Sequence, residues 1–337
     1  MSGTINIIES RPGEDTFRYF DEVLTKVYPP SSLRFKTKES FNAFYFQSCL
    51  IALVGGDVAG RLCVYSNPHI NIDGKPCLLI GNFECVDDDR VCSALIQYVE
   101  RIADDKNISY VVGPVNGTTW DDYRFPLTEC VDPYLSDSLQ QPYYAEMFER
   151  NGFNILHRYY TSVAENDGNK KAQPQEIEYL KANAIAIRNI DLSNYESELR
   201  KVYVLCIEAF KNNALYSPVG ESYFIQKYIG LKDLLDPAFV LLAEHEGELA
   251  GLYFCLPDLY AHRVIVKTIA KHPDCHVKGL IDIMGKMLYE AAYAKGYSRF
   301  IHAYMHEHNR SRTVSENFHG QVTREYAVFV KQLAHER

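Results

Sequence analysis

A short stretch near the end of the chain carries residue types that could move protons. His302, Tyr304 and His306 alternate along an apolar run, so on a strand their side chains would project from one face. Imidazole, phenol and the nearby carboxylate of Glu307 are groups that proteins use as general acids and bases. The plainer alternative is that they are buried, hydrogen-bonded strand residues. The pattern therefore predicts a base among His302, His306 and Glu307, or at Glu244, with Tyr304 as the nearest acid.

A second stretch could bind an anion, because a glycine precedes a strongly amphipathic helix. Free backbone amides and the positive end of the helix dipole favour an anion there, and glycine lets it approach the backbone closely. Two basic side chains add positive charge. The plainer alternative is a simple strand-to-helix turn. The expected site consists of His276, Val277, Lys278, Gly279, Leu280 and Ile281.

The elements that would position these residues form a pattern that occurs twice. Each half of the chain reads as a strand, helices, three strands, a helix, a strand, a helix and a last strand. A polar segment containing Gly and Pro follows Glu165. We therefore expect an α/β protein with a first domain over 1–165, a linker over 166–183 and a second domain over 184–337. Around the candidate site we expect strands at Val264–Ala270 and Phe300–Met305, helices at Gly279–Ala294 and Asn309–Phe318, and last strands at Phe153–Val163 and Val322–Val330.

Composition and charge exclude several classes of protein. The 337 residues are 47% hydrophobic and 23% charged, which is typical of a globular chain and not of a disordered one. The net charge of -9 lies in residues 1–165, which hold 14 Lys and Arg against 23 Asp and Glu, whereas the remaining residues hold 21 of each kind. Since neither half is basic, we expect no nucleic-acid partner.

The location and the metal content are inferred from what the sequence lacks. No stretch approaches the roughly 18 apolar residues of a membrane span, and no export signal is visible. The nine cysteines are dispersed and form no C-x-x-C pair, which indicates reduced thiols and no metal site. We therefore expect a cytoplasmic protein without a membrane partner, either a monomer or a homodimer.

The order of elements and the glycine loop resemble those of the GNAT superfamily of N-acyltransferases. The loop signature of that family is similar to Gln/Arg-x-x-Gly-x-Gly/Ala. Here Gly279 is kept, His276 stands at the first position and Ile281 at the last. The resemblance implies a mixed, mostly antiparallel sheet flanked by helices, with acetyl-CoA or another acyl-CoA as co-substrate and its pyrophosphate on the loop. It also implies that the thioester lies against the backbone of Lys267, Thr268, Ile269 and Ala270.

A second family signature resembles Asn-x-x-Ala-x-x-x-Tyr-x-x-x-Gly-Phe. In this chain Asn309 is kept, Arg312 stands at the alanine position, Glu316 at the tyrosine position, and Gly320 is kept. The resemblance implies that Asn309 and Arg312 lie beside the pantetheine arm of CoA. It also implies that the tyrosine that protonates the departing thiolate is missing here. The first half shows the same spacing, with Gln141, Tyr144, Phe148, Gly152 and Phe153.

The first half differs at its own loop, where Asp87, Asp88 and Asp89 precede the helix and no glycine is present. Their carboxylates would satisfy the free amides and repel a pyrophosphate. We therefore expect this half to be a degenerate copy that binds no CoA. Glu84 ends its fourth strand, where some family members place a base. Asn116 and Trp120 could line a substrate pocket in the cleft between the halves, or could simply build a loop and pack.

The resemblance predicts an N-acyltransferase that acts on a small-molecule amine or a peptide. The first alternative is a catalytically inactive acyl-CoA sensor or interaction protein, which the missing tyrosine favours. The second is a Fem-like aminoacyl transferase that uses charged tRNA. The acidic first half and the neutral second half argue against a tRNA-binding surface.

Overall fold

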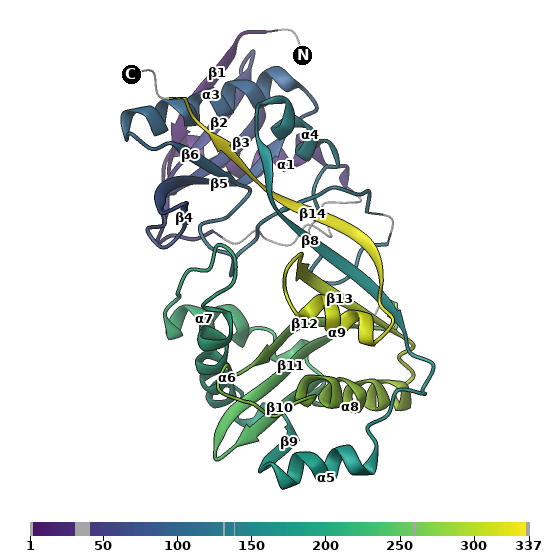
Figure 1. Cartoon of the computed structure of the whole chain (residues 1–337). Helices are drawn as coiled ribbons and strands as arrows, with labels where there is room; N and C mark the ends of the chain where they lie inside the picture. The colour runs from purple at the N-terminus through teal and green to yellow at the C-terminus, as the bar shows by residue number, and fades with distance from the viewer. Residues whose placement is uncertain (1–2, 31–40, 131, 138, 259–260, 335–337) are drawn as a thin grey trace. The chain divides into compact units, whose positions relative to one another are not determined.

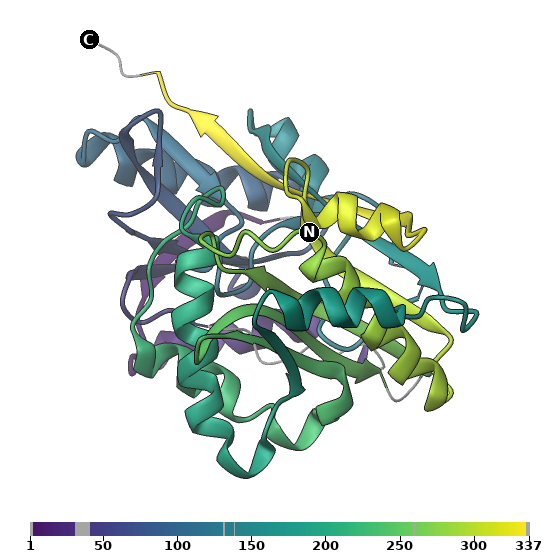
Figure 2. The same cartoon turned by 60° about the horizontal axis from the view of Figure 1, so that its bottom comes forward.

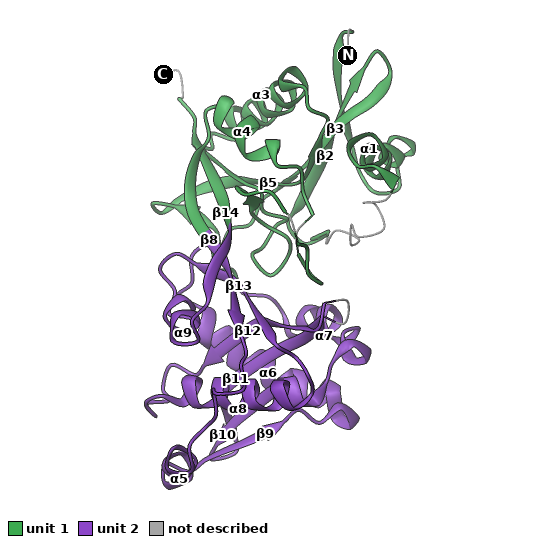
Figure 3. Ribbon diagram, turned by 90° about the vertical axis from the view of Figure 1, so that its right-hand side faces the viewer, with its two compact units in different colours: residues 1–158, 215–217, 325–337 green, residues 159–214, 218–324 purple. Residues whose placement is uncertain are grey.

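The computed structural model describes residues 3–30, 41–130, 132–137, 139–258 and 261–334. They form two compact units, coloured separately in Figure 3. Unit 1 comprises residues 1–158, 215–217 and 325–337, and unit 2 comprises residues 159–214 and 218–324.

Unit 1 is built on a mixed sheet with the strand order β1-β2-β3-β5-β6-β14. β5 and β6 run parallel, and the other neighbours in this order are antiparallel. Its strands are β1 (Ile5–Ser10), β2 (Phe46–Val54), β3 (Asp57–Tyr65), β4 (Asn71–Ile72), β5 (Lys75–Cys85), β6 (Tyr110–Gly113), β7 (Phe125–Pro126), the start of β8 (Asn154–Glu165) and most of β14 (Gln321–Gln332).

The helices of unit 1 are α1 (Tyr19–Val27), α3 (Asp89–Asp105) and α4 (Tyr143–Arg150), with a 3-10 turn η1 (Asp15–Arg18) ahead of α1. The apolar positions of α3 recur at Val91, Leu95 and Val99, as in an amphipathic helix, and all three side chains are buried in the unit 1 core. The helix that follows the predicted acidic loop is therefore packed on the core of its own unit.

Unit 2 repeats this arrangement with the order β9-β10-β11-β12-β13-β8. Again one pair, β12 and β13, is parallel, and the other neighbours are antiparallel. The mixed, mostly antiparallel sheets flanked by helices that the sequence predicts are confirmed. The strands of unit 2 are β9 (Ile185–Asn189), β10 (Val240–His245), β11 (Glu248–Asp258), β12 (Arg263–Lys271) and β13 (Arg299–His306), together with residues 159–165 of β8.

Helices cover both faces of the unit 2 sheet. Tyr253 and Cys255 of β11 belong to the core that α8 packs against, whereas the ring of the intervening Phe254 lies 6.2 Å from that of Tyr228 on α7. Figures 1 and 2 show α6 on one side of the strands and α8 on the other. The helices are α5 (Pro174–Ala182), α6 (Tyr195–Phe210), α7 (Glu221–Ile229), α8 (Leu280–Ala294) and α9 (Ser311–Asn317), with 3-10 turns η2 (Leu192–Asn194), η3 (Lys232–Leu234) and η4 (Pro237–Phe239).

The last strand of each sheet comes from the other half of the sequence. In unit 1, β6 pairs with residues 329–332 of β14, and in unit 2, β13 pairs with residues 159–165 of β8. The sequence predicts both strands but places each in its own half. Alternation identifies a strand by its period, and that period carries no information about which sheet the strand joins.

The segment 166–183, expected as a linker, contains the helix α5. Pro174 occupies its first turn, and Gln173 and Glu176 form a reciprocal capping box at its start. Polar composition hid this helix, because only Leu180 among its residues is buried and the apolar period is weak.

Candidate cofactor and active site

In unit 2, the pairing of β12 with β13 ends where the sequence predicts a thioester site. Their register ends at Val266 opposite His302, and β12 then continues through residues 267–271, here called the splayed segment. A bulge in the pairing of β12 with β11 falls at its start, between Val266 and Thr268. Lys267, Thr268 and Ile269 are half-exposed there, and Ala270 is buried. Where two neighbouring strands separate, their main-chain amides no longer pair with each other and can meet a ligand.

The predicted anion loop follows the splayed segment after residues 272–275. Gly279 is the N-cap of α8 and adopts the left-handed backbone conformation, with φ of +70°. No side chain among the described residues caps this helix start. His276, Lys278 and Gly279 are exposed, Val277 is half-buried with its carbonyl bound by Lys271 Nζ at 2.8 Å, and of the next two residues Leu280 is buried and Ile281 half-buried. The loop thus presents basic side chains beside an uncapped helix N-terminus.

The corresponding place in unit 1 is filled by the unit itself. Residues 80–85 of β5 are buried, and the register of β5 with β6 ends at Leu79 opposite Val112. The carboxamide Oδ1 of Asn116 accepts a hydrogen bond from the Asn82 amide at 2.6 Å. A Cβ added to Gly81 would lie 2.4 Å from the same Oδ1, so the packing is tight.

Tyr144 occupies the far end of the same segment of β5. Its hydroxyl accepts from the Cys85 amide at 3.1 Å and donates to Glu84 Oε2 at 2.6 Å. Burial and the neighbouring Glu84 raise the pKa of Tyr144, so its proton stays in place. Glu84, a predicted base, is fully buried with this hydroxyl on its carboxylate.

The helix start of unit 1 is capped by one of the three predicted aspartates. The Asp88 side chain accepts from the Arg90 amide at 3.1 Å, and it also pairs with the Arg90 guanidinium at 2.6 Å. Asp89 pairs with Arg150 at 2.9 Å. These arginines offset part of the negative charge, but the amide end of α3 already has a carboxylate acceptor.

His302, the first predicted catalytic residue, lies in the unit 2 interior. Its Nδ1 lies 2.8 Å from Ser315 Oγ and its Nε2 lies 3.0 Å from Tyr289 Oη. Burial, with a smaller contribution from the Lys170 charge, lowers the pKa of His302 to about 4. Because both ring nitrogens are engaged, the side chain fits a structural role better than that of a base.

This burial predicts that acid destabilises the protein through His302. An unfolded chain binds the proton near the ordinary pKa of 6.5 and the folded chain only near 4, so the stabilisation is complete above pH 6.5 and declines as the pH falls. Between pH 7 and pH 4.5 the loss is about 2–3 kcal/mol. Urea unfolding at both pH values, compared with His302→Gln, measures it. An equal acid loss in the variant would contradict this assignment.

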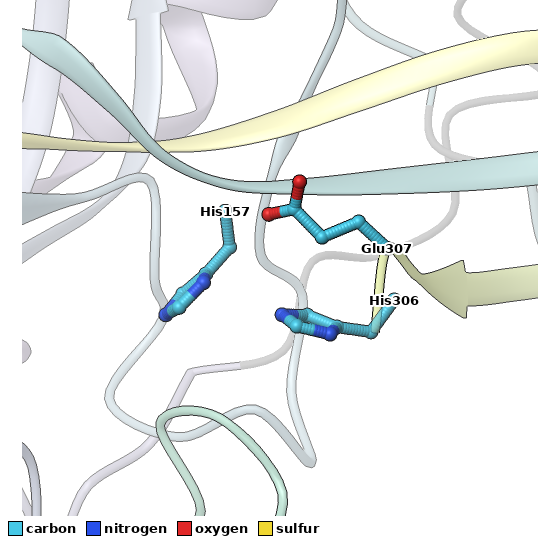
Figure 4. A group of neighbouring side chains, drawn as sticks. All are labelled: His157, His306 and Glu307. Atoms are coloured by element: carbon cyan, nitrogen blue, oxygen red, sulfur yellow. The ribbon is translucent and has the colours of Figure 1, made fainter. Parts of the chain in front are cut away.

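Tyr304, Glu307 and His306 lie at the C-terminal end of β13. Tyr304 and Glu307 are half-exposed, whereas His306 is buried and its Nδ1 accepts from the His308 amide at 3.1 Å. Figure 4 shows the His306 ring and the Glu307 carboxylate extending to the same side from consecutive residues. His157, which Figure 4 also labels, belongs to unit 1. Glu244, the remaining predicted base, instead pairs with Arg188 at 2.7 Å.

The second signature lies on and before α9. Asn309 and Arg312 are half-exposed, and Glu316, at the tyrosine position, is exposed. The Arg312 guanidinium lies over the ring of Tyr160, 4.3 Å from its centroid. Asn309 thus lies in the β13–α9 connection and Arg312 in the first turn of α9, while the anion loop precedes α8.

The predicted substrate residues Asn116 and Trp120 belong to unit 1. Asn116 is buried with its carboxamide on the Asn82 amide, and Trp120 is half-buried with its Nε1 donating to the Ser217 carbonyl at 2.9 Å. Both of these contacts are internal to unit 1.

Comparison with solved structures matches nearly the whole chain. A GCN5-related N-acetyltransferase from Sphaerobacter thermophilus is 12% identical, with a TM-score of 0.55, covering 97% of this chain and 95% of that one. A tandem GNAT protein from the clavulanic acid biosynthesis pathway is 11% identical, with a TM-score of 0.55, covering 99% and 100%. The chain has the GNAT fold. The resemblance inferred from the glycine loop and the order of elements is confirmed at that level.

Among curated proteins, the bacterial ceramide synthase of Caulobacter vibrioides is 22% identical over 286 residues, which cover 75% of this chain and 74% of that protein. No family model matches the chain. Within the described part of the chain, each helix is too short or too polar to span a bilayer.

Proposed function

We propose that this GNAT protein is an acyl-CoA-dependent N-acyltransferase that binds one CoA, in unit 2. The contrast between the two units carries the proposal. Unit 2 has a half-exposed splayed segment and an uncapped helix start at Gly279, whereas unit 1 fills the same two places with Asn116, Tyr144 and Asp88. A ligand with a pyrophosphate and a thioester suits the first arrangement, because both of its polar groups would meet main-chain amides.

In the proposed complex the pyrophosphate lies on residues 276–281 and the pantetheine arm passes Asn309 and Arg312. The thioester carbonyl accepts from the amides of residues 267–270. The amine nitrogen attacks the thioester carbon, the C–S bond breaks, and the amine proton leaves for a base. Glu307 and Tyr304 are the half-exposed acid–base groups at the end of β13, and we assign them as base and as donor to the thiolate.

The relative named ceramide synthase suggests which amine to try first. A ceramide is the amide of a fatty acid with a long-chain amino alcohol, so its synthesis is an N-acylation. We therefore include a long-chain amino alcohol and a fatty acyl-CoA among the substrates, beside acetyl-CoA and small amines or peptides.

Binding is tested by thermal unfolding with CoA, acetyl-CoA and desulfo-CoA. At about 100 times its dissociation constant, a ligand adds about 2.7 kcal/mol to the unfolding free energy, and we expect the melting temperature to rise by roughly 5 °C. The absence of a shift with every CoA species would sink the proposal.

Turnover is tested by release of free CoA thiol across the acyl-CoA and amine panel. Release that depends on an amine supports the enzyme. CoA binding without release from any pair supports the inactive sensor, which the exposed Glu316 in the tyrosine position favours.

A further inference from the structure

His302 lies where three elements of unit 2 meet. It stands on β13, its Nδ1 contacts Ser315 of α9 at 2.8 Å, and its Nε2 contacts Tyr289 of α8 at 3.0 Å. The side chain therefore joins the helix behind the anion loop to the helix that carries Arg312. No other role is assigned to it in the proposed reaction.

The neutral imidazole is suited to this position because it offers one donor and one acceptor. The hydroxyls of Tyr289 and Ser315 can each take either part, so both contacts are satisfied without a charge. The groups that face His302 are Tyr289 from α8, Ser315 from α9 and Lys170 from the segment before α5. The positive charge of Lys170 and the burial both oppose protonation of the ring.

The α8 side of this connection is rigid. The ring of Tyr289 stacks on Phe300 at 3.7 Å between centroids and on Phe318 at 4.6 Å. A Cβ added to the neighbouring Gly285 would lie 2.5 Å from the Phe318 ring, so this packing leaves no spare room. The Tyr289 hydroxyl is thus held in place toward β13.

The α9 side combines polar and apolar contacts. This helix has seven residues, and Ser315 is the one that is buried. Asn317 Nδ2 donates to Asp282 Oδ1 in the first turn of α8 at 3.0 Å, and Lys170 Nζ donates to the Phe318 carbonyl at 2.7 Å. Val314 and the buried Phe318, which ends the helix, also pack against the core that contains α8. The packing of Phe318 holds the end of α9 against α8, and the contact of Ser315 with His302 ties the same helix to β13.

We propose that His302 is a positioning residue that sets the place of α9 relative to α8 and β13, and so holds Arg312 and Asn309 on the proposed path of the pantetheine arm. This inference rests on the proposed CoA site and adds a residue that acts on it from the interior. His302 therefore affects the binding of the pantetheine arm through Asn309 and Arg312, and it takes no part in proton transfer.

The test compares two ligands on four variants. CoA engages both helices, whereas adenosine 3′-phosphate 5′-diphosphate lacks the pantetheine arm and engages only the anion loop. In His302→Leu and in Ser315→Ala we expect the dissociation constant for CoA to rise about tenfold, with that of the nucleotide changed less than about twofold. His302→Gln, whose carboxamide can donate and accept, should recover most of the CoA affinity.

His319→Asn is the matched control. His319 is exposed beyond α9 and has φ of +59°, a conformation that asparagine tolerates. It should bind both ligands like the wild type. Unchanged CoA affinity in His302→Leu and Ser315→Ala, or an equal loss of both ligands, overturns the inference while wild-type binding leaves the CoA site standing. A wild type that binds neither ligand refutes the proposed function itself.

Discussion

Replacing Gly279 by glutamate is expected to weaken CoA binding at least 100-fold, or about 2.7 kcal/mol. The added carboxylate would stand at the N-cap of α8, on the positive end of the helix dipole, and would repel the pyrophosphate. Among the residues that the structure describes, a Cβ at Gly279 would meet only Ile283 Cδ1, at 3.9 Å, so the change does not crowd the fold. Isothermal titration with CoA measures the loss.

A residue other than glycine strains the backbone at this position, because φ at Gly279 is +70°. The variant Gly247→Glu is the control for this strain. Gly247 has φ of +89° and nothing within 4 Å of an added Cβ, and it lies in the β10–β11 turn. Both variants should lose about 1–2 kcal/mol of stability from the left-handed backbone. Only Gly279→Glu should lose CoA, and equal affinities in the two variants would place the site elsewhere.

Replacing Asp258 by alanine is expected to destabilise unit 2 by about 3–5 kcal/mol, because it leaves a buried guanidinium without its carboxylate. Asp258 Oδ2 accepts from Arg263 Nε at 3.0 Å and from the terminal nitrogen at 2.7 Å, and the two side chains are 2% and 4% exposed. Arg263 begins β12, the strand that ends in the splayed segment. Urea unfolding measures the loss.

The double variant Asp258→Leu with Arg263→Met separates charge burial from packing. It removes both charges and keeps apolar volume, so it should lose much less stability than Asp258→Ala. If the double variant lost the sum of the two single losses, the pair would not act as a unit and the explanation would be wrong.

The sequence predicts the elements around the candidate site well. The expected strand Val264–Ala270 and helix Gly279–Ala294 appear as β12 and α8 within a residue or two. Both have strong local signals: a run of β-branched residues in the strand, and in the helix a clear apolar period with a glycine before it. The pattern that occurs twice in the sequence also occurs twice in the structure. The two sheets have equivalent strand orders, and each sheet has its parallel pair at the equivalent position.

What the sequence could not predict depends on contacts between distant residues. His302 and Tyr304 share an alternating pattern, but only the positions of Tyr289 and Ser315 decide that the histidine is engaged on both nitrogens. In unit 1, the aspartates at the helix start are visible in the sequence as a cap. The hydrogen bond from the Asn82 amide to the Asn116 carboxamide joins residues that are 34 positions apart in the sequence, and no spacing rule predicts this contact.

The exchanged last strands determine the order in which the two sheets can be completed during translation. The sheet of unit 1 lacks its β6 neighbour until residues 329–332 have left the ribosome, although the rest of that unit is translated first. Until then β6 presents an open edge, which is the kind of edge that recruits unrelated strands. Unit 2 receives its β13 neighbour from residues already made, so we expect unit 2 to complete its sheet as soon as β13 is translated. The half that is translated first is therefore the half whose sheet is completed last.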